Sequence, residues 1–341
     1  MAILAFIVER RREGTSQSRE TLVRINENAM TVEERILKIE NNYITHKTIH
    51  LNTEKYIYLG NKESKKCRFC SKSEPEVTFN SIAHAIPEFV NNHRLISYYE
   101  CDSCNSKFAR TIETHMGDYM NVYHTLSQVK GKRGVPSFKK GGEKSRIDYT
   151  TEGLKIDYFQ DEKENVKIDE KNKTLTVTAT RATYIPIAIY KCLTKMALTI
   201  MEDDELVHFE KTLNWINEEK HDESRYFMSS LQCIFSITPG PLPHDFTTCI
   251  LLKRKSDNLE NVPYMIFILA YGNYTFQIFV PMCDLDARGE PFSMIPIPTP
   301  FDFKNEYGSP DYKILDFYST DKCKGEEVSL TLGFEKMTKK K

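Results

Sequence analysis

The chain has 341 residues, 40% of them hydrophobic and 28% charged, with a formal net charge of −1. This composition supports a packed core and excludes a disordered chain, and the near-zero net charge means that any polyanion-binding surface must be local. At about 150 residues per domain, the length predicts about two domains.

The first 60 residues are expected to form an N-terminal extension. The apolar stretch MAILAFIV is shorter than the ~18 residues of a membrane helix, and the following ERRREG is unlike the end of a secretory signal. We therefore expect a soluble, cytoplasmic protein with no membrane partner. TVEERILKIENNY predicts a helix with a Thr31–Glu34 capping box, and YITHKTIHLNTEKYIYLG predicts two short strands.

Two C-x-x-C pairs come next, Cys67 with Cys70 and Cys101 with Cys104. A two-residue spacer lets both thiolates of a pair face one ion, so the pairs predict a closed, tetrahedral zinc site with a structural role. Four free core cysteines would fit poorly, because polar residues flank both pairs. The other five cysteines are scattered singly, as in a reducing cytoplasm rather than in a disulfide framework.

The thirty residues between the pairs are too many for a simple zinc ribbon. VTFNSIAHAIP predicts a strand that ends at His84 and is stopped by Pro87, and LISYYE predicts a short returning strand. A helix from Asp102 should bury Phe108, Ile112 and Met116 as one stripe, with Gly117 as a stop or kink before a second helical run, DYMNVYHTLSQV. The pattern is a ββα unit held together by zinc.

A basic stretch, residues 130–146, forms the best domain boundary because it carries four glycines and a proline. Its cations, opposed only by Glu143, are Lys130, Lys132, Arg133, Lys139, Lys140, Lys144 and Arg146. Lysine and arginine supply sequence-independent affinity for DNA phosphates. A solvated linker is an equally good interpretation of the same residues.

Residues 147–341 predict an α+β region with an antiparallel sheet. Several alternating segments read as strands, and PIAIYKCLTKMALTIM and DDELVHFEKTLNWINEE read as helices, the first starting at Pro186 and the second anchored in the core by Trp215. His208, His221 and His244 are isolated, without metal-ligand spacing. This region contains no recognisable catalytic constellation.

The combination C-x-x-C, AHAIPE, a loop asparagine and ECDSCNSKF resembles the HNH endonuclease superfamily in its four-cysteine, ββα-metal form, over roughly residues 65–125. The resemblance implies a nuclease module at 61–129. It implies that His84 is the general base, that Asn105 is a ligand of one catalytic Mg²⁺ or Mn²⁺ ion, and that Asn92 or its neighbour Asn91 orients the histidine through backbone hydrogen bonds.

One position departs from the family pattern. Many members have an aspartate directly before the histidine as a second metal ligand, but this chain has Ala83. Glu88, Glu113 or His115 could substitute, the ion could be held weakly, or the site could be inactive. In a regular α-helix Glu113 would lie roughly 80° around the axis from Asn105.

The leading expectation is a metal-dependent DNA endonuclease with a C-terminal sensing or regulatory domain that binds another protein or a small signalling ligand. Fusions of this kind suggest, by analogy, a bacterial defence or restriction effector. The rival interpretations are a non-catalytic, zinc-stabilised nucleic-acid-binding module and a structural subunit of a larger assembly. The oligomeric state and the choice between DNA and RNA stay open.

Overall fold

The computed structural model describes residues 30–51, 55–139, 146–157, 165–221, 231–242, 246–258, 260–286, 292, 294–303 and 306–338. The fold is α+β, as predicted, and its strands pair antiparallel with one short exception. No helix in these ranges is both long and apolar enough to cross a membrane.

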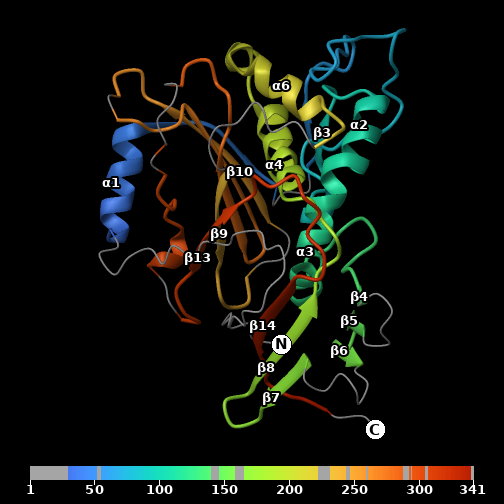
Figure 1. The fold of residues 1–341 in the computed structure, drawn as a ribbon, viewed down its shortest axis with the longest axis vertical. Helices are drawn as coiled ribbons and strands as arrows, with labels where there is room; N and C mark the ends of the chain where they lie inside the picture. Colours follow the sequence, from blue (N-terminus) through green and yellow to red (C-terminus); the bar gives the residue numbers. More distant parts are fainter. Residues whose placement is uncertain are drawn as a thin grey trace.

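A six-stranded antiparallel sheet forms the largest layer (Figure 1). Its strands, in spatial order, are β1 (Tyr43–His50), β10 (Thr247–Arg254), β11 (Met265–Tyr271), β12 (Tyr274–Phe279), β9 (Gln232–Ile237) and β13 (Asp311–Asp316). Both faces of the central strands are buried, which explains why β11 is an almost continuous apolar run. The edge strand β1 comes from the predicted N-terminal extension, so this segment completes the sheet of the C-terminal region.

The helix α4 (Pro186–Ile200) packs against one face of the sheet and against α3 (Thr114–Leu126) (Figure 1), and α3 itself reaches the sheet through the hydrogen bond between His124 and Tyr271. It begins at Pro186, as predicted. All fifteen of its residues are buried, so the predicted apolar face of Ile189, Leu193 and Ala197 is only part of its contact surface. A helix in this position is covered on all sides, and its polar residues must find partners inside the protein.

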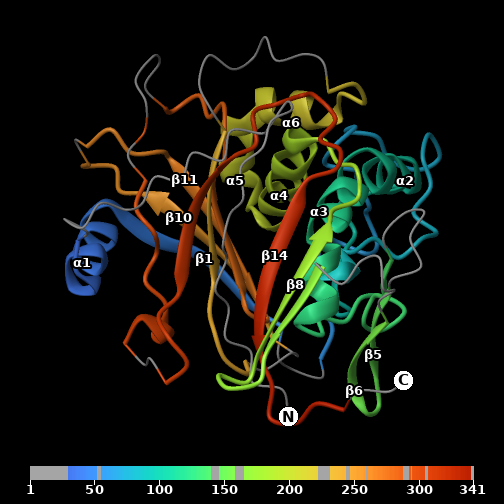
Figure 2. The same cartoon turned by 60° about the horizontal axis from the view of Figure 1, so that its bottom comes forward.

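The other face of the sheet carries α1 (Val32–Asn42) (Figures 1 and 2). The predicted capping box is present, because the Thr31 side chain accepts from the backbone N–H of Glu34 and the Glu34 carboxylate accepts from the N–H of Thr31. A small second core forms here around Tyr43, Leu252 and Ile266.

The predicted helix at 203–219 is broken into three pieces: α5 (Asp203–Leu206), a 3₁₀ turn (Val207–Phe209) and α6 (Glu210–Asn217). Trp215 is fully buried, as predicted. Two three-stranded sheets lie at the end of the molecule beyond α3 (Figure 2): β14 (Glu327–Gly333), β8 (Thr174–Thr180) and β7 (Val166–Asp169), and β4 (Phe138–Lys139), β5 (Arg146–Thr150) and β6 (Gly153–Asp157). A 3₁₀ turn (Pro300–Asp302) precedes β13.

The cysteine-bearing segment consists of β2 (Ile57–Leu59), a 3₁₀ turn (Glu88–Val90), β3 (Leu95–Ser97), α2 (Asp102–Phe108), a π-helical turn (Ala109–Glu113) and α3. The prediction of a regular first strand in the ββα unit is wrong, because in VTFNSIAHAIP only His84 forms a β-bridge, with Ile96. Asp102 is the physical reason, because its carboxylate accepts from the backbone N–H groups of Asn80 and Ser81, which a ladder would need.

The prediction of a stop or kink at Gly117 is also wrong, because α3 runs through it without interruption. A glycine costs a helix only about 1 kcal/mol relative to alanine. Burial of the predicted stripe Phe108, Ile112 and Met116, each with no exposed surface, outweighs that cost. The irregularity lies earlier, in the π turn, where the Thr114 hydroxyl donates to the carbonyl of Ala109.

The cysteine-bearing segment and α4 are tied together by Arg68. Its guanidinium donates to the carbonyl oxygens of Thr199 at 2.9 Å and Met201 at 3.0 Å, and thereby caps the C-terminal end of α4. One continuous core includes Cys104, Leu193 and Phe267. The four-part division of the chain at residues 60, 129 and 146 stays a prediction.

Candidate functional site

The four cysteines of the two C-x-x-C pairs meet at one point, with their sulfur atoms all within 4.8 Å of one another. The Sγ atoms of Cys70 and Cys101, one from each pair, are 3.7 Å apart. Four ligands at ~2.3 Å from a tetrahedral zinc would lie about 3.8 Å from each other, so the residues fit the ion. Zinc bound here has no open position and supplies structure rather than chemistry.

The four thiols share their charge unequally when no ion is bound. The hydrogen bond from Cys104 lowers the pKa of Cys67 to about 4, whereas the same bond raises the pKa of Cys104 and burial raises that of Cys70. The five cysteines outside this cluster are free thiols, and four of them are buried.

Asp102 holds the start of α2 against the loop that precedes His84. Its carboxylate accepts hydrogen bonds from the Thr78 hydroxyl at 2.5 Å, the Asn80 N–H at 3.0 Å and the Ser81 N–H at 2.8 Å. The second cysteine pair and the histidine-bearing chain are therefore linked by side-chain to backbone bonds as well as by the metal site.

His84 lies at the end of that chain with its ring half-buried. The backbone N–H of Ala85 donates to the Leu95 carbonyl at 3.0 Å and the N–H of Ser97 donates to the Ala83 carbonyl at 2.8 Å, so His84 and Ile96 form an antiparallel pair. Burial lowers the pKa of His84, with smaller contributions from neighbouring charges. The imidazole is accordingly neutral at pH 7 and can accept a proton.

Asn92 closes the loop beyond His84. It is completely buried, donates to the Ile86 carbonyl, and accepts the N–H groups of Arg94 and Leu95, each at 3.0 Å. Its neighbour Asn91 instead adopts the left-handed conformation at the end of the 3₁₀ turn. Asn92 thus binds the backbone on both sides of the loop, and the orientation of His84 by Asn92 or Asn91 stays a prediction.

Residues 67–121 match the family model described as HNH endonuclease. The match agrees with the resemblance seen in the motifs and indicates a nuclease-type function, with nucleic acid as the implied substrate. No curated protein and no solved structure matches the chain. We call residues 67–121 the HNH module.

Ala83 faces the interior of the HNH module and is 2% exposed. The missing aspartate has no direct replacement at that point. Across the residues that the structure describes, the four cysteines form the only gathering of three or more histidine, cysteine, aspartate or glutamate ligands. The role of Asn105 as a ligand of a catalytic ion stays a prediction.

Glu88, one of the proposed replacements for the missing aspartate ligand, lies close to two basic side chains. It lies 3.8 Å from the Nδ1 atom of the exposed His93 and 3.5 Å from the Nζ atom of Lys132. Its negative charge counteracts the lowering of the His84 pKa. Glu88 is thus part of the electrostatic surroundings of His84.

Glu113, the second substitute, contacts a lysine from outside the HNH module. The Nζ atom of Lys195 in α4 lies 3.3 Å from Glu113, 2.8 Å from Glu100 and 3.4 Å from the His84 carbonyl oxygen. Lys195 and Glu100 have no exposed side-chain surface. The two glutamates raise the pKa of Lys195 despite its burial, whereas burial raises the pKa of Glu100 to about 7. The ammonium ion thus joins two helices to the histidine-bearing chain.

Lys195 was missed by sequence reasoning, although a signal existed. Two lysines, Lys191 and Lys195, stand four residues apart in the otherwise apolar PIAIYKCLTKMALTI. Lysine is almost never fully buried unless it is paired. An apolar helix with two lysines therefore predicts buried acceptors on its neighbours.

Asn105 is half-buried on the first turn of α2, directly after Cys104. A π turn lies between Asn105 and Glu113, so the offset of about 80° expected for a regular α-helix does not apply. A π turn holds more residues and rotates less per residue about the helix axis, which brings Asn105 and Glu113 closer to the same side of the helix. His115, the third substitute, instead packs its ring against His221 at 5.9 Å, and burial lowers its pKa.

The basic stretch starts beside the His84 loop. Gly131 and Gly134 pair as a tight turn, and a Cβ on Gly131 would lie 3.4 Å from the backbone of Phe89. The cations of this stretch that the structure shows exposed are Lys130, Lys132, Arg133 and Lys139. Lys140 and Lys144 lie outside the described residues, and Arg146 pairs with Asp148.

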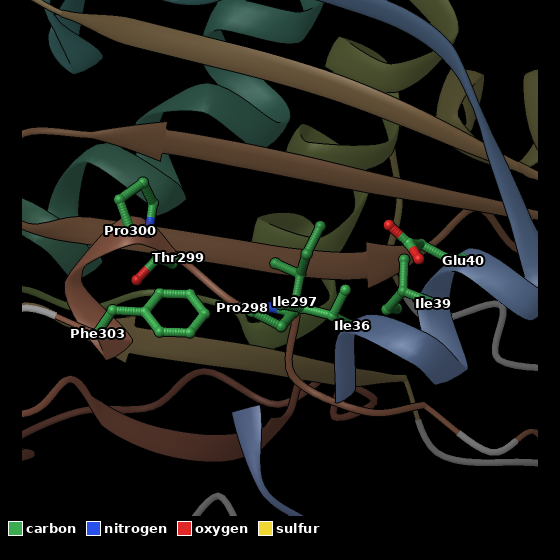
Figure 3. A pocket seen from close by; sticks show the side chains of 8 residues that line it. All are labelled: Ile36, Ile39, Glu40, Ile297, Pro298, Thr299, Pro300 and Phe303. Carbon is green, nitrogen blue, oxygen red and sulfur yellow. The ribbon is translucent and has the colours of Figure 1, made fainter. Parts of the chain in front are cut away.

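A shallow pocket lies on the far side of the six-stranded sheet from the HNH module (Figures 1 and 3). Its lining is mainly apolar and includes Ile36, Ile39, Ile297 and Phe303, with Glu40 at one end (Figure 3). A single carboxylate among aliphatic and aromatic groups offers no hydrolytic chemistry.

Proposed function

We propose that the chain is a metal-dependent DNA endonuclease that hydrolyses phosphodiester bonds with His84 as the general base. The observation that carries the proposal is the half-buried His84, held by its bridge to Ile96 within the segment that matches HNH endonucleases and contains the four-cysteine cluster.

In this proposal His84 takes a proton from a water molecule, and the oxygen of that water attacks the scissile phosphate. Asn92 keeps the chain after His84 in place through its backbone hydrogen bonds. Asn105, with Glu113 or Glu88, would hold one Mg²⁺ or Mn²⁺ ion. Such an ion, when bound, stabilises the charge that develops on the phosphate and the leaving oxygen.

The exposed cations Lys130, Lys132, Arg133 and Lys139, with Lys140, would contact DNA phosphates. Lys132 supports this role because it reaches Glu88 in the same loop region as His84. Each phosphate contact adds to the salt dependence of binding, so removing one lysine should reduce the slope of affinity against salt by about one.

The test is cleavage of plasmid DNA with added Mg²⁺, Mn²⁺ or EDTA. General acid–base catalysis contributes about 10²- to 10⁴-fold, so His84→Ala should lower the nicking rate by that factor. His93→Ala is the matched control, because His93 is an exposed histidine in the same loop. A loss of cleavage in His93→Ala but not in His84→Ala would refute the assignment of the base.

A second function is favoured by two observations, the buried Ala83 and the ammonium of Lys195 beside Glu113. Both weaken a catalytic metal site, as in a non-catalytic zinc-stabilised nucleic-acid-binding module. Retarded but uncut DNA under every metal condition would support this alternative. Absence of any DNA interaction would point to a structural subunit of a larger assembly.

The remaining parts of the proposal concern the cell. We propose that residues 147–341 sense a regulatory protein or a small signalling ligand and release nuclease activity, that the protein is cytoplasmic, and that it serves bacterial defence or restriction. Activation of cleavage by a cell extract or by a candidate ligand, lost on His84→Ala, would test this regulatory role.

A further inference from the structure

Three tyrosines, two of them exposed and Tyr98 half-buried, form a stack at the edge of the β2–β3 pair. The rings of Tyr56 and Tyr58 are stacked with centroids 6.1 Å apart, and those of Tyr58 and Tyr98 are nearly parallel at 5.6 Å. Tyr56 is 58% exposed and Tyr58 is 54% exposed. Large aromatic side chains normally supply core energy, so a stack left this open is available to another molecule.

The stack shares a face with His84. Tyr58 pairs with Ile96 across β2 and β3, and His84 pairs with Ile96 from the other side. Directly paired residues in a sheet point to the same face, and so do residues two apart, such as Tyr98 and Ile96. The alternate residues Ile57 and Leu59 pack against the core, which leaves the tyrosines on the outer face.

The distance between the stack and His84 is short on the scale of a nucleic acid. Adjacent strands lie about 4.8 Å apart, so two strand spacings separate the backbones of Tyr58 and His84 by about 10 Å. If one phosphate of a DNA strand lies at His84, a base only a few nucleotides away along the same DNA strand can reach Tyr58.

The surroundings of the stack are positively charged. The Nζ atom of Lys65 lies 5.8 Å from the centre of the Tyr98 ring and 5.7 Å from that of Phe79. The segment KYIYLGNKESKK, residues 55–66, has four lysines against one glutamate. Stacking rings flanked by cations are the combination that holds single-stranded nucleic acids, because each base has an aromatic face and each phosphate a negative charge.

We propose that Tyr56, Tyr58 and Tyr98 form a stacking platform for unpaired bases, which directs the enzyme to single-stranded or locally unpaired DNA. The position of the cut phosphate rests on the proposed nuclease function, whereas base stacking itself does not. In a duplex the bases are stacked on each other, and the platform has no base face to bind.

The experiment is fluorescence anisotropy on the full chain loaded with zinc, without added Mg²⁺ or Mn²⁺. Three labelled probes are compared: a single strand, its duplex, and the same strand with abasic sites in place of the bases. Stacking on one aromatic residue changes the affinity by roughly 5- to 150-fold, so Tyr58→Leu should weaken single-strand binding by a factor in this range.

Tyr58→Phe keeps the ring and should bind like the wild type. Tyr307→Leu is the control for loss of an exposed tyrosine elsewhere, since Tyr307 is 37% exposed outside the HNH module. Zinc content and thermal unfolding verify the fold of each variant, and Tyr56→Leu is the second test should Tyr58→Leu not fold. The wild type should bind the abasic strand and the duplex more weakly than the single strand, and these two affinities should not change in Tyr58→Leu.

Equal binding of the abasic and intact strands by the wild type, or unchanged single-strand affinity in both leucine variants, would overturn the platform. These results are separable from plasmid cleavage. Cleavage that depends on His84 without base stacking refutes only the platform, and stacking without cleavage refutes only the nuclease.

Discussion

The HNH module and the sheet with α4 are held together by different means. The module has few regular strands, and its shape depends on four thiols and on polar side chains such as Asp102 and Asn92 that bind backbone groups. The sheet and α4 rely on apolar burial, with Leu193, Phe267 and their neighbours fully enclosed. The module also shares the main apolar core through residues such as Phe108 and Ile112, but its irregular loops depend on specific polar contacts, so single substitutions there should have sharply local effects.

Loss of a zinc ligand should give the largest difference in stability between the HNH module and the sheet with α4. Structural zinc contributes about 10–16 kcal/mol of binding free energy in small zinc-finger peptides, so Cys104→Ser should release the ion and unfold the module. Zinc stoichiometry by mass spectrometry and calorimetric unfolding measure this effect. The control is Cys323→Ser, which changes a half-buried cysteine outside the two C-x-x-C pairs and should keep one zinc per chain. An equal loss of zinc in both variants would contradict the site.

Lys195→Met tests the contact between the regions. Breaking a buried ion pair costs about 3–5 kcal/mol, because the remaining partner stays buried without its counter-charge. Here that partner is Glu100, whose pKa burial already raises to about 7, so loss of Lys195 favours its protonated form. Urea unfolding should show a loss of this size. Adding Glu100→Gln should restore part of it, whereas Lys211→Met removes a surface pair with Asp284 and should cost at most about 1 kcal/mol. Comparable losses of unfolding free energy in Lys195→Met and Lys211→Met would show that Lys195 does not stabilise the contact between the two regions.

Asp102→Ala removes the carboxylate that binds Thr78, Asn80 and Ser81. Because water can replace these solvent-exposed bonds, we expect a loss of only about 0.5–1.5 kcal/mol, with faster transfer of zinc to a chelator. Asp169→Ala, which removes only a local turn contact with Asn172, should leave zinc release unchanged. Unchanged zinc release in Asp102→Ala would show that the carboxylate does not brace the module.

The smallest expected effect concerns the pH dependence of cleavage. Glu88 raises the pKa of His84 and Lys132 lowers it, against the larger effect of burial. A general base is active when deprotonated, so activity falls as the pH falls through its pKa. Glu88→Gln should move the acid limb of kcat/KM to lower pH, and Lys132→Met should move it, by less, to higher pH. Shifts in the opposite directions would exclude His84 as the base.

Much of the fold was predictable from local patterns. Pro186 predicted the start of α4, the capping box predicted the start of α1, and the stripe from Phe108 to Met116 predicted a helix buried on that side. Gly117 and the strand before His84 were mispredicted, because burial and the Asp102 carboxylate outweighed local preference. The proposed roles of Asn105 and Glu113 stay predictions.

The sequence by itself determined the zinc quartet and the resemblance around His84, because both depend on the spacing of a few residues along a short stretch of chain. Only the tertiary structure placed the ammonium of Lys195 between Glu113 and the His84 carbonyl and set three tyrosines on the face of His84. These contacts join residues far apart in the sequence, and their positions depend on how helices and strands pack, which no local pattern encodes.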